Sequence, residues 1–183
     1  MEEEDLVKQC SAKDRAAQQE LYTRYAARLL TLCRRYSDTK QEAEDILHDT
    51  FLIAFDRLAS FKYKGEGSLY AWLRRIAVNQ AIDRIRKYRW KLLPIRAQLQ
   101  EESVALEEDD LMRITQEELL GFISGLPKVR RTVFNLYCLD GYSHKEIAKM
   151  LGISEKGSAS ILSKAKNQLK SEVGKYLTNH KER

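Results

Sequence analysis

The feature that most limits the possible folds is helical periodicity along almost the whole chain. Apolar residues recur every three or four positions, the spacing that places them on one side of an α-helix. Two such stripes are Leu21, Tyr25, Leu29, Leu32 and Tyr36, and Leu47, Phe51, Phe55 and Leu58. No segment shows the alternation typical of a β-strand. Only 2 Pro and 8 Gly occur in 183 residues, so the sequence predicts an all-α protein with long helices.

Signals for helix ends divide this pattern into elements. Three pairs have the spacing of a capping box, in which a hydroxyl and a carboxylate three residues on bond each other's backbone N–H: Thr39 and Glu42, Thr115 and Glu118, and Ser143 and Glu146. A long helix is expected from about Ser68 to about Trp90, because Pro94 follows it. Gly125 should end one helix and Pro127 should take the first position of the next. The last helix is expected over about Glu155 to Tyr176.

The charge is unevenly distributed along the chain. Residues 1–93 carry 18 basic and 14 acidic side chains, a net charge of +4, and residues 119–183 carry 12 and 5, a net charge of +7. Residues 94–118 carry 2 and 8, a net charge of −6. Two basic bodies joined by an acidic connector indicate a polyanionic partner. We therefore predict two small domains, a helical bundle at 1–93 and a second domain at 117–183, joined by a flexible linker at 94–116.

Several classes of protein are disfavoured. The chain has three cysteines and no CxxC, and its three histidines lack metal-ligand spacing, so neither a disulfide framework nor a metal site is expected. No P-loop and no Ser/His/Asp set occurs, so we expect no catalytic residue and no cofactor. No apolar run approaches the roughly 18 residues that span a bilayer. The acidic N-terminus lacks a secretory signal, and we expect a cytoplasmic protein without membrane insertion.

Residues 145–166, KEIAKMLGISEKGSASILSKAK, have the pattern of a helix-turn-helix. Ala148 lets two helices pack closely, Gly152 supplies the turn, and Ile153 fills the core beneath it. The following helix carries small polar residues and cations, which suits a DNA major groove about 12 Å wide. Two packed helices with a glycine turn also occur elsewhere, but the capping box and the basic second helix favour DNA binding.

A second basic segment is RRIAVNQAIDRIRKYRW, residues 74–90. On a helix, one stripe would hold Arg75, Asn79, Asp83, Lys87 and Trp90. Cations for phosphates, polar groups for base edges and an aromatic ring for stacking are typical of single-strand binding. A solvated charged face is the alternative. The loop FKYKGEGS before it favours binding, because its glycines let a backbone approach a nucleotide closely.

Three segments resemble successive signatures of the extracytoplasmic-function (ECF) sigma factors of bacterial RNA polymerase. They are AEDILHDTFLIAF (43–55), FKYKGEGSLYAWLRRIAVNQAIDRIRK (61–87) and LPKVRRTVFNLYCLDGYSHKEIAKMLGIS (126–154). The resemblance covers about residues 10–92 and 117–172. It implies a non-catalytic factor with a promoter-melting domain and a helix-turn-helix domain, which binds core polymerase and recognises the minus-ten and minus-thirty-five promoter elements.

The resemblance also implies three sets of site residues. Binding to the β′ clamp helices of core polymerase is implied for Asp45, His48, Asp49 and Phe51, with His48 in place of the usual Gln. Minus-ten recognition is implied for Tyr63, Lys64, Gly65, Glu66, Gly67, Ser68, Arg75, Asn79, Asp83, Arg84 and Lys87. Minus-thirty-five recognition is implied for Arg130, Arg131, Lys156, Gly157, Ala159, Ser160, Ser163 and Lys164.

Within the minus-ten set, the loop and Asn79 would capture an extruded base while Arg75, Arg84 and Lys87 hold phosphates. Asp83 would orient Asn79 or Arg75, or bridge to Lys87 within the helix; the sequence leaves these roles open. In the helix-turn-helix the chain departs from the family. Ala159 and Ile161 stand where Arg or Lys is frequent, and Ser158 stands where the family usually has an apolar residue.

The partners implied are core polymerase, through the β′ clamp helices and the β flap, and promoter DNA. The family also implies an anti-sigma factor, for which no residue here gives evidence of its own. The acidic linker would mimic nucleic acid or act as a passive tether. The alternative function is a stand-alone helix-turn-helix regulator, which would leave the glycine loop and the basic helix without a role.

Overall fold

The computed structural model describes residues 2–92 and 114–181. The chain divides into two compact units, Met1–Tyr88 and Arg89–Arg183. All regular secondary structure of the described residues is helical, which confirms the predicted fold class. None of these helices combines the length and apolar character needed to cross a bilayer. Most of the predicted linker at 94–116 lies outside the described residues, and the domain limits given above stay predictions.

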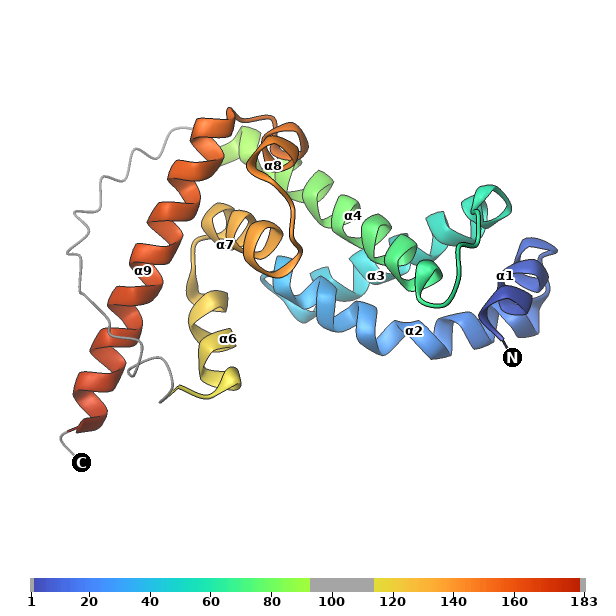
Figure 1. Ribbon diagram of the computed structural model, residues 1–183, viewed down its shortest axis with the longest axis horizontal. Helices are drawn as coiled ribbons and strands as arrows, with labels where there is room; N and C mark the ends of the chain where they lie inside the picture. Colours follow the sequence, from blue (N-terminus) through green and yellow to red (C-terminus); the bar gives the residue numbers. More distant parts are fainter. Residues whose placement is uncertain (1, 93–113, 182–183) are drawn as a thin grey trace. The chain divides into compact units, whose positions relative to one another are not determined.

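The first unit is built from four α-helices (Figure 1). They are α1 (Glu3–Ser11), α2 (Arg15–Tyr36), α3 (Lys40–Arg57) and α4 (Ser68–Leu92), with a short 3-10 turn, η1 (Leu58–Ser60), after α3. The long helix predicted to begin at Ser68 is confirmed and ends two residues beyond its expected end. It lies against α2 and α3, as its contacts with Tyr25 of α2 and Asp49 of α3 show.

The core of the first unit follows the predicted stripes. The stripe along α2, from Leu21 to Tyr36, is buried at all five positions. Along α3 and η1, Leu47, Phe51 and Leu58 are buried, and Phe55 is half-buried. Helix α4 adds a face of apolar side chains: Leu69, Leu73, Ile76, Ala77, Val78, Ala81, Ile82 and Ile85. Each large side chain of this kind stabilises the unit by about 1.5–3 kcal/mol, and together they fix which side of α4 points outward.

The start of α3 differs slightly from the predicted capping box. Thr39 Oγ1 accepts from the Glu42 N–H at 3.1 Å, as expected. The Glu42 carboxylate, however, accepts from the Asp38 N–H at 2.8 Å rather than from Thr39. The N–H at Asp38 is one residue outside the expected position, so the reciprocal half of the box is shifted towards the preceding turn. The boxes at Thr115 and Ser143 are complete.

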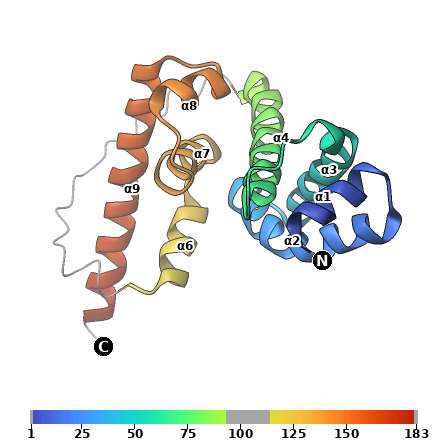
Figure 2. The same ribbon diagram turned by 45° about the vertical axis from the view of Figure 1, so that its right-hand side comes forward.

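The second unit contains α6 (Gln116–Gly125), α7 (Lys128–Phe134), α8 (His144–Leu151) and α9 (Glu155–Lys181), with α6, α7 and α8 packed against α9 (Figure 2). Helix α7 continues as a wider π-helical turn, η2 (Asn135–Leu139), closed by the Asp140 N–H donating to the Asn135 carbonyl at 2.9 Å. Between α8 and α9, Gly152 has φ +64° and ψ +43°. This left-handed conformation favours glycine, which confirms its predicted role in the turn.

Two sequence expectations for this unit were wrong in detail. Pro127 is the N-cap of α7, with ψ 139°, and not its first helical residue. Its fixed φ suits both positions, so the sequence could not separate them. Helix α9 runs five residues past Tyr176, to Lys181. The extension follows from the burial of Val173 and Leu177, which keep the last turns of α9 packed on the unit.

Candidate nucleic-acid interface

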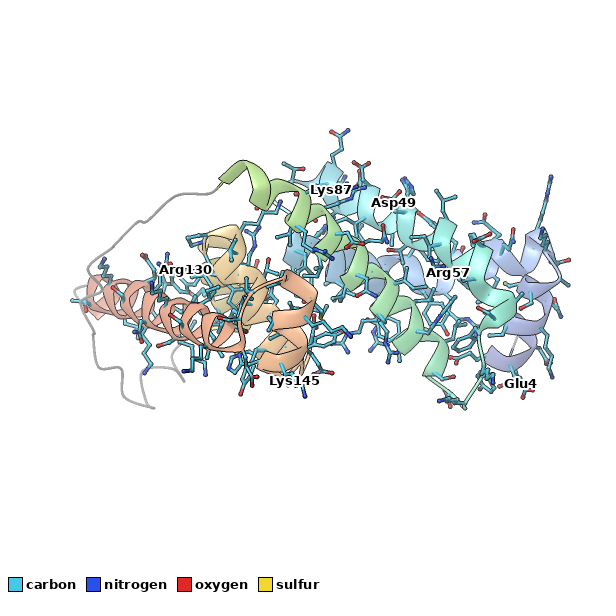
Figure 3. All side chains as sticks on the ribbon, turned by 90° about the horizontal axis from the view of Figure 1, so that it is seen from above. Glu4, Asp49, Arg57, Lys87, Arg130 and Lys145 are labelled. Carbon is cyan, nitrogen blue, oxygen red and sulfur yellow. The ribbon has the colours of Figure 1, made fainter. Side chains whose placement is uncertain are left out.

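The outer face of α4 holds the polar stripe that the sequence predicts. Arg75, Asn79, Asp83 and Lys87 are exposed, one turn apart, and Lys87 is labelled in Figure 3. The carboxylate of Asp83 lies 3.5 Å from Arg86, and both side chains are more than half exposed. Among the roles left open for Asp83, an ion pair within the helix is therefore present, but with Arg86 as its partner. The side chain of Trp90 lies outside the described residues.

The loop before α4 takes a backbone path that requires glycine. Gly65 has φ +107° and Gly67 has φ +81°, in the region that side chains disfavour. The Lys64 N–H donates to the Ser68 hydroxyl at 3.2 Å, and the Ser68 N–H donates to the Gly65 carbonyl at 3.1 Å. Lys64 and Glu66 are exposed, and Tyr63 is half-buried. The loop thus presents its backbone and the polar side chains of Lys64 and Glu66 beside the start of the basic helix.

A buried carboxylate that the sequence did not reveal anchors this loop. Glu3 of α1, 9% exposed, accepts hydrogen bonds from the N–H groups of Gly67 and Leu69 at 3.2 and 3.1 Å. It also accepts from the Tyr25 hydroxyl at 3.0 Å. Burial and then this hydrogen bond raise the pKa of Tyr25 to about 12, so the phenol stays protonated and remains a donor. The two backbone partners of Glu3, at Gly67 and Leu69, are more than 60 positions away, so no local pattern could have indicated this anchor.

The acidic side chains predicted on α3 do face outward. Asp45 and His48 are exposed and Asp49 is half-buried; Asp49 is labelled in Figure 3. Arg84 of α4 reaches both acids, with Nη2 2.6 Å from Asp49 and Nη1 3.6 Å from Asp45. Burial alone would lower the pKa of Arg84, but these carboxylates outweigh it and raise the pKa. A phosphate at Arg84, as the resemblance implies, would have to compete with two carboxylates.

Phe51, which the resemblance includes among the contact residues, faces the core, as the apolar stripe of α3 predicts. Phe51 is 3% exposed, and its ring centroid lies 4.7 Å from that of Tyr22 and 5.9 Å from that of Phe55. It is part of the core and positions α3 without presenting a surface to a partner. The neighbouring Leu52, by contrast, is 69% exposed. Leu52 falls outside the apolar stripe of α3, and this is the signal by which the sequence could have marked it as a contact residue.

In the second unit, the predicted contact face lies along the first turns of α9. Lys156, Ala159, Ser160, Ser163 and Lys164 are all exposed. Gly157 is half-buried and its N–H donates to the Ser154 hydroxyl at 3.0 Å. A Cβ at this position would lie 3.0 Å from the same hydroxyl. The exposure of this face agrees with the sequence prediction, while its contact with DNA stays a prediction.

The unusual Ser158 has a structural explanation. Its side chain is fully buried, and Oγ lies 3.0 Å from Nδ1 of His144 on α8. The His144 ring in turn stacks on Tyr137, with centroids 4.5 Å apart. A buried hydroxyl needs such a partner, so a polar residue is tolerated where the family usually has an apolar one. The pair links the first helix of the helix-turn-helix to the second.

The two arginines of α7 have different environments. Arg131 is 7% exposed and donates from Nη1 to the Ser124 carbonyl at 2.8 Å, near the end of α6. The guanidinium is buried in the unit, so a contact with DNA phosphate, which stays a prediction, would require this side chain to move outward. Arg130, labelled in Figure 3, is half-buried and donates to Gln168 of α9 at 2.9 Å.

Two lysines that were not among the predicted contact residues lie on the first helix of the helix-turn-helix. Lys145, labelled in Figure 3, and Lys149 are exposed one turn apart on α8. In helix-turn-helix proteins the first helix crosses the DNA backbone, so cations there are suited to phosphate. Their spacing of four residues before the glycine turn is a signal that the sequence contains.

The comparisons with known proteins agree with this geometry. Residues 21–91 match the family model of sigma-70 region 2, and residues 116–169 match that of sigma-70 region 4. The chain is 30% identical over 175 residues to the ECF RNA polymerase sigma factor SigM of Mycobacterium tuberculosis (strain ATCC 25618 / H37Rv), covering 91% of this chain and 81% of that protein. It is 27% identical to SigM of Bacillus subtilis (strain 168), covering 82% and 91%.

A solved structure shares the fold. The sigma factor RpoE of Bartonella quintana, determined in complex with the anti-sigma factor NepR, has a TM-score of 0.50 and 23% identity, covering 86% of this chain and 96% of that one. The matches to these sequence relatives cover both units. Sigma-70 regions 2 and 4 occur along the chain in the order that the resemblance implied. The chain belongs to the ECF sigma factors of RNA polymerase.

Proposed function

We propose that this sigma factor divides its task among three surfaces. As a member of its family it binds core RNA polymerase and promoter DNA, recognises promoters and starts transcription without being an enzyme. The first surface is the outer face of α4 with the glycine loop, the second is the acidic side of α3, and the third is the exposed face of α8 and α9. The family membership replaces the stand-alone regulator considered above.

The minus-ten strand would be bound by α4 and its loop, and one observation carries this proposal. Arg75, Asn79 and Lys87 are exposed on one side of a helix that starts directly after a loop with two left-handed glycines. Asn79 lies about 16 Å along α4 from Ser68, at 1.5 Å per residue. The strand would therefore run along the helix, with the cations on its phosphates and Asn79 on an unstacked base.

Core polymerase would be bound through α3. Asp45, His48 and Asp49 form the polar part of this surface, and the exposed Leu52 adds an apolar contact one turn from His48. An acidic surface with an exposed apolar side chain beside it suits a basic helical partner. We assign the β′ clamp helices to this surface and the β flap to the second unit, following the family resemblance.

The minus-thirty-five element would be read by α9. Lys156, Ser160, Ser163 and Lys164 are the exposed polar side chains of its first turns, and Lys145 and Lys149 of α8 would hold phosphates. A lysine ammonium can donate to guanine O6 and N7, but it lacks the rigid planar fork of arginine, and a serine hydroxyl bonds to several bases. We therefore expect weaker base discrimination at this element, with affinity that depends strongly on salt.

We also propose a cytoplasmic location and control by an anti-sigma factor. The first follows from the site of transcription in bacteria, and the second from the kind of complex in which the related Bartonella sigma factor was solved. The second proposal is tested by co-purification of the tagged protein with a partner that blocks its binding to core polymerase.

The proposed function is tested by transcription in vitro with bacterial core polymerase and a genomic promoter library. The protein should direct start-site-specific RNA, and the promoters recovered should share two elements. The variant Asn79→Ala should reduce open-complex formation by about tenfold or more, on the scale of a lost base contact, while its binding to the upstream duplex stays unchanged. Equal loss of both would remove Asn79 from base capture.

A further inference from the structure

The carboxylate of Glu3 lies where α1 meets the start of α4, and it joins four parts of the first unit. Its Oε1 accepts from the Leu69 N–H at 3.1 Å, and its Oε2 accepts from the Gly67 N–H at 3.2 Å and from the Tyr25 hydroxyl at 3.0 Å. Helix α1, helix α2, the glycine loop and the first turn of α4 are thus held by one side chain. It is 9% exposed.

The position of this carboxylate has a clear physical basis. The first N–H groups of a helix have no partner within the helix, and they favour negative charge nearby. A cap normally comes from the residue just before the helix. Here it comes from 64 residues earlier in the chain, so the same bonds that cap α4 also fix the end of the loop in space.

The element that carries Glu3 is itself held firmly. Leu6 and Cys10 of α1 are buried against the rest of the unit, and α1 packs on α2. Tyr25 stacks on Tyr70 of α4 with centroids 6.1 Å apart, and the Arg28 guanidinium lies 3.8 Å above the Tyr70 ring. Glu3 therefore connects the loop to a rigid neighbourhood of helix and stacked rings.

We propose that Glu3 is a positioning residue for promoter recognition, which holds the end of the glycine loop in the conformation that admits one extruded base. This inference rests on the proposed function of the loop. Glu3 contacts backbone N–H groups and a phenol, so it acts through the loop and does not touch DNA. A loop fixed in advance loses less conformational freedom on binding, and a fixed pocket rejects a wrong base more strongly than a mobile one.

The remaining contacts of the loop limit what a change at Glu3 would do. The Lys64 N–H still bonds to the Ser68 hydroxyl, and Phe61 still packs on Trp72 with centroids 4.9 Å apart. Only the end of the loop at Gly67 would be released. We therefore expect discrimination between bases to fall while the unit stays folded and α4 keeps its cations for the phosphates.

The variant Glu3→Gln tests this inference. Replacing one carboxylate oxygen by an NH₂ group puts a donor opposite at least one backbone N–H, so at least one of the two bonds is lost. Holoenzyme would be competed with single-stranded oligonucleotides of the minus-ten element found by the transcription experiment, with each of the four bases at each position. The ratio of affinities for the correct and wrong bases should fall about three- to tenfold at one position, the effect of a lost hydrogen bond.

Tyr25→Phe is the matched control, because it removes the hydroxyl bond to Glu3 but leaves both backbone bonds. It should keep the wild-type ratio. A Glu3→Gln protein with an unchanged ratio would overturn the inference, and so would an equal fall in affinity for every oligonucleotide, which indicates a merely structural role. Glu3→Asp, measured in parallel, is too short to reach both N–H groups and should also lower the ratio.

Unfolding of both Glu3 variants would also overturn the inference, since a residue that only positions the loop cannot be essential to the fold. Failure of the proposed function would look different. In that case the wild-type holoenzyme itself would show no preference among the oligonucleotides and would give no start-site-specific RNA.

Discussion

The contrast between Arg131 and Lys164 gives a sharp test of how the second unit meets DNA. Arg131 is 7% exposed and bonded to the Ser124 carbonyl at 2.8 Å, whereas Lys164 is exposed on α9. The substitution Arg131→Met keeps the length and apolar stem of the side chain and removes the guanidinium. A hydrogen bond from a charged group contributes about 1.5–3 kcal/mol. Because Ser124 is exposed, water can partly replace the bond, and the expected loss is about 1–2 kcal/mol.

Arg131→Met should change stability but not the salt dependence of DNA binding, and Lys164→Ala should do the reverse. For a unit of this size, each kcal/mol lowers Tm by roughly 4–8 °C, so Arg131→Met should lower the Tm of the second unit by about 4–16 °C. For this variant, the slope of log DNA affinity against log salt concentration should not change, because no phosphate contact is lost. Lys164→Ala should leave stability within about 0.5 kcal/mol and should reduce the salt slope by about 0.9, the effect of one phosphate contact.

The assay is fluorescence anisotropy with a duplex of the upstream element at four salt concentrations, together with thermal unfolding of the same full-length proteins. If Arg131→Met kept the wild-type Tm and lowered the slope by about 1, Arg131 would be a phosphate ligand and the assignment of its side chain to the interior would be refuted. An unchanged slope for Lys164→Ala would remove that lysine from the interface.

Three further outcomes are expected. In a double-mutant cycle, Arg84→Gln and Asp49→Asn should show a coupling of about 1 kcal/mol in urea unfolding, since the pair is only partly exposed; additive effects would contradict it. Ser158→Ala should destabilise the second unit by about 1 kcal/mol, because a buried hydrogen bond is lost; a gain in stability would contradict that bond. Burial raises the pKa of Cys33 to about 12, so at pH 8 its thiol is protonated and buried. Alkylation followed by mass spectrometry should modify the exposed Cys138 in the native protein and Cys33 only after denaturation; equal rates would contradict this.

Much of the fold could be predicted because the information was local. The start of α4 at Ser68, the capping boxes at Thr115 and Ser143 and the left-handed Gly152 each depend on residues within four positions of one another. The outward stripe of α4 followed from the same periodicity. Local patterns state which side of a helix points to solvent, and here they did so correctly from Arg75 to Lys87.

The local environments that the sequence did not indicate depend on distant neighbours. Arg130 and Arg131 are adjacent and chemically identical, yet one bonds to α9 and the other is buried against the end of α6. The burial of Phe51 follows from the apolar stripe of α3, but its ring contact with Tyr22 of α2 does not. Such contacts between helices form only when distant parts of the chain come together, so neither composition nor periodicity contained these partners.

The long-range contacts of α4 also explain how such a basic helix stays on its unit. The helix has seven basic residues and one acidic residue, so its cations repel one another. Carboxylates from other helices hold it at two points: Glu3 at the first turn, and Asp49 with Asp45 at Arg84. These points are about 22 Å apart along the axis. Because Glu3 is buried and Arg84 and Asp49 are half-buried, salt screens these anchors less than it screens the exposed cations. Rising ionic strength should therefore weaken strand binding well before it loosens α4, which lets the affinity of this surface vary without loss of its shape.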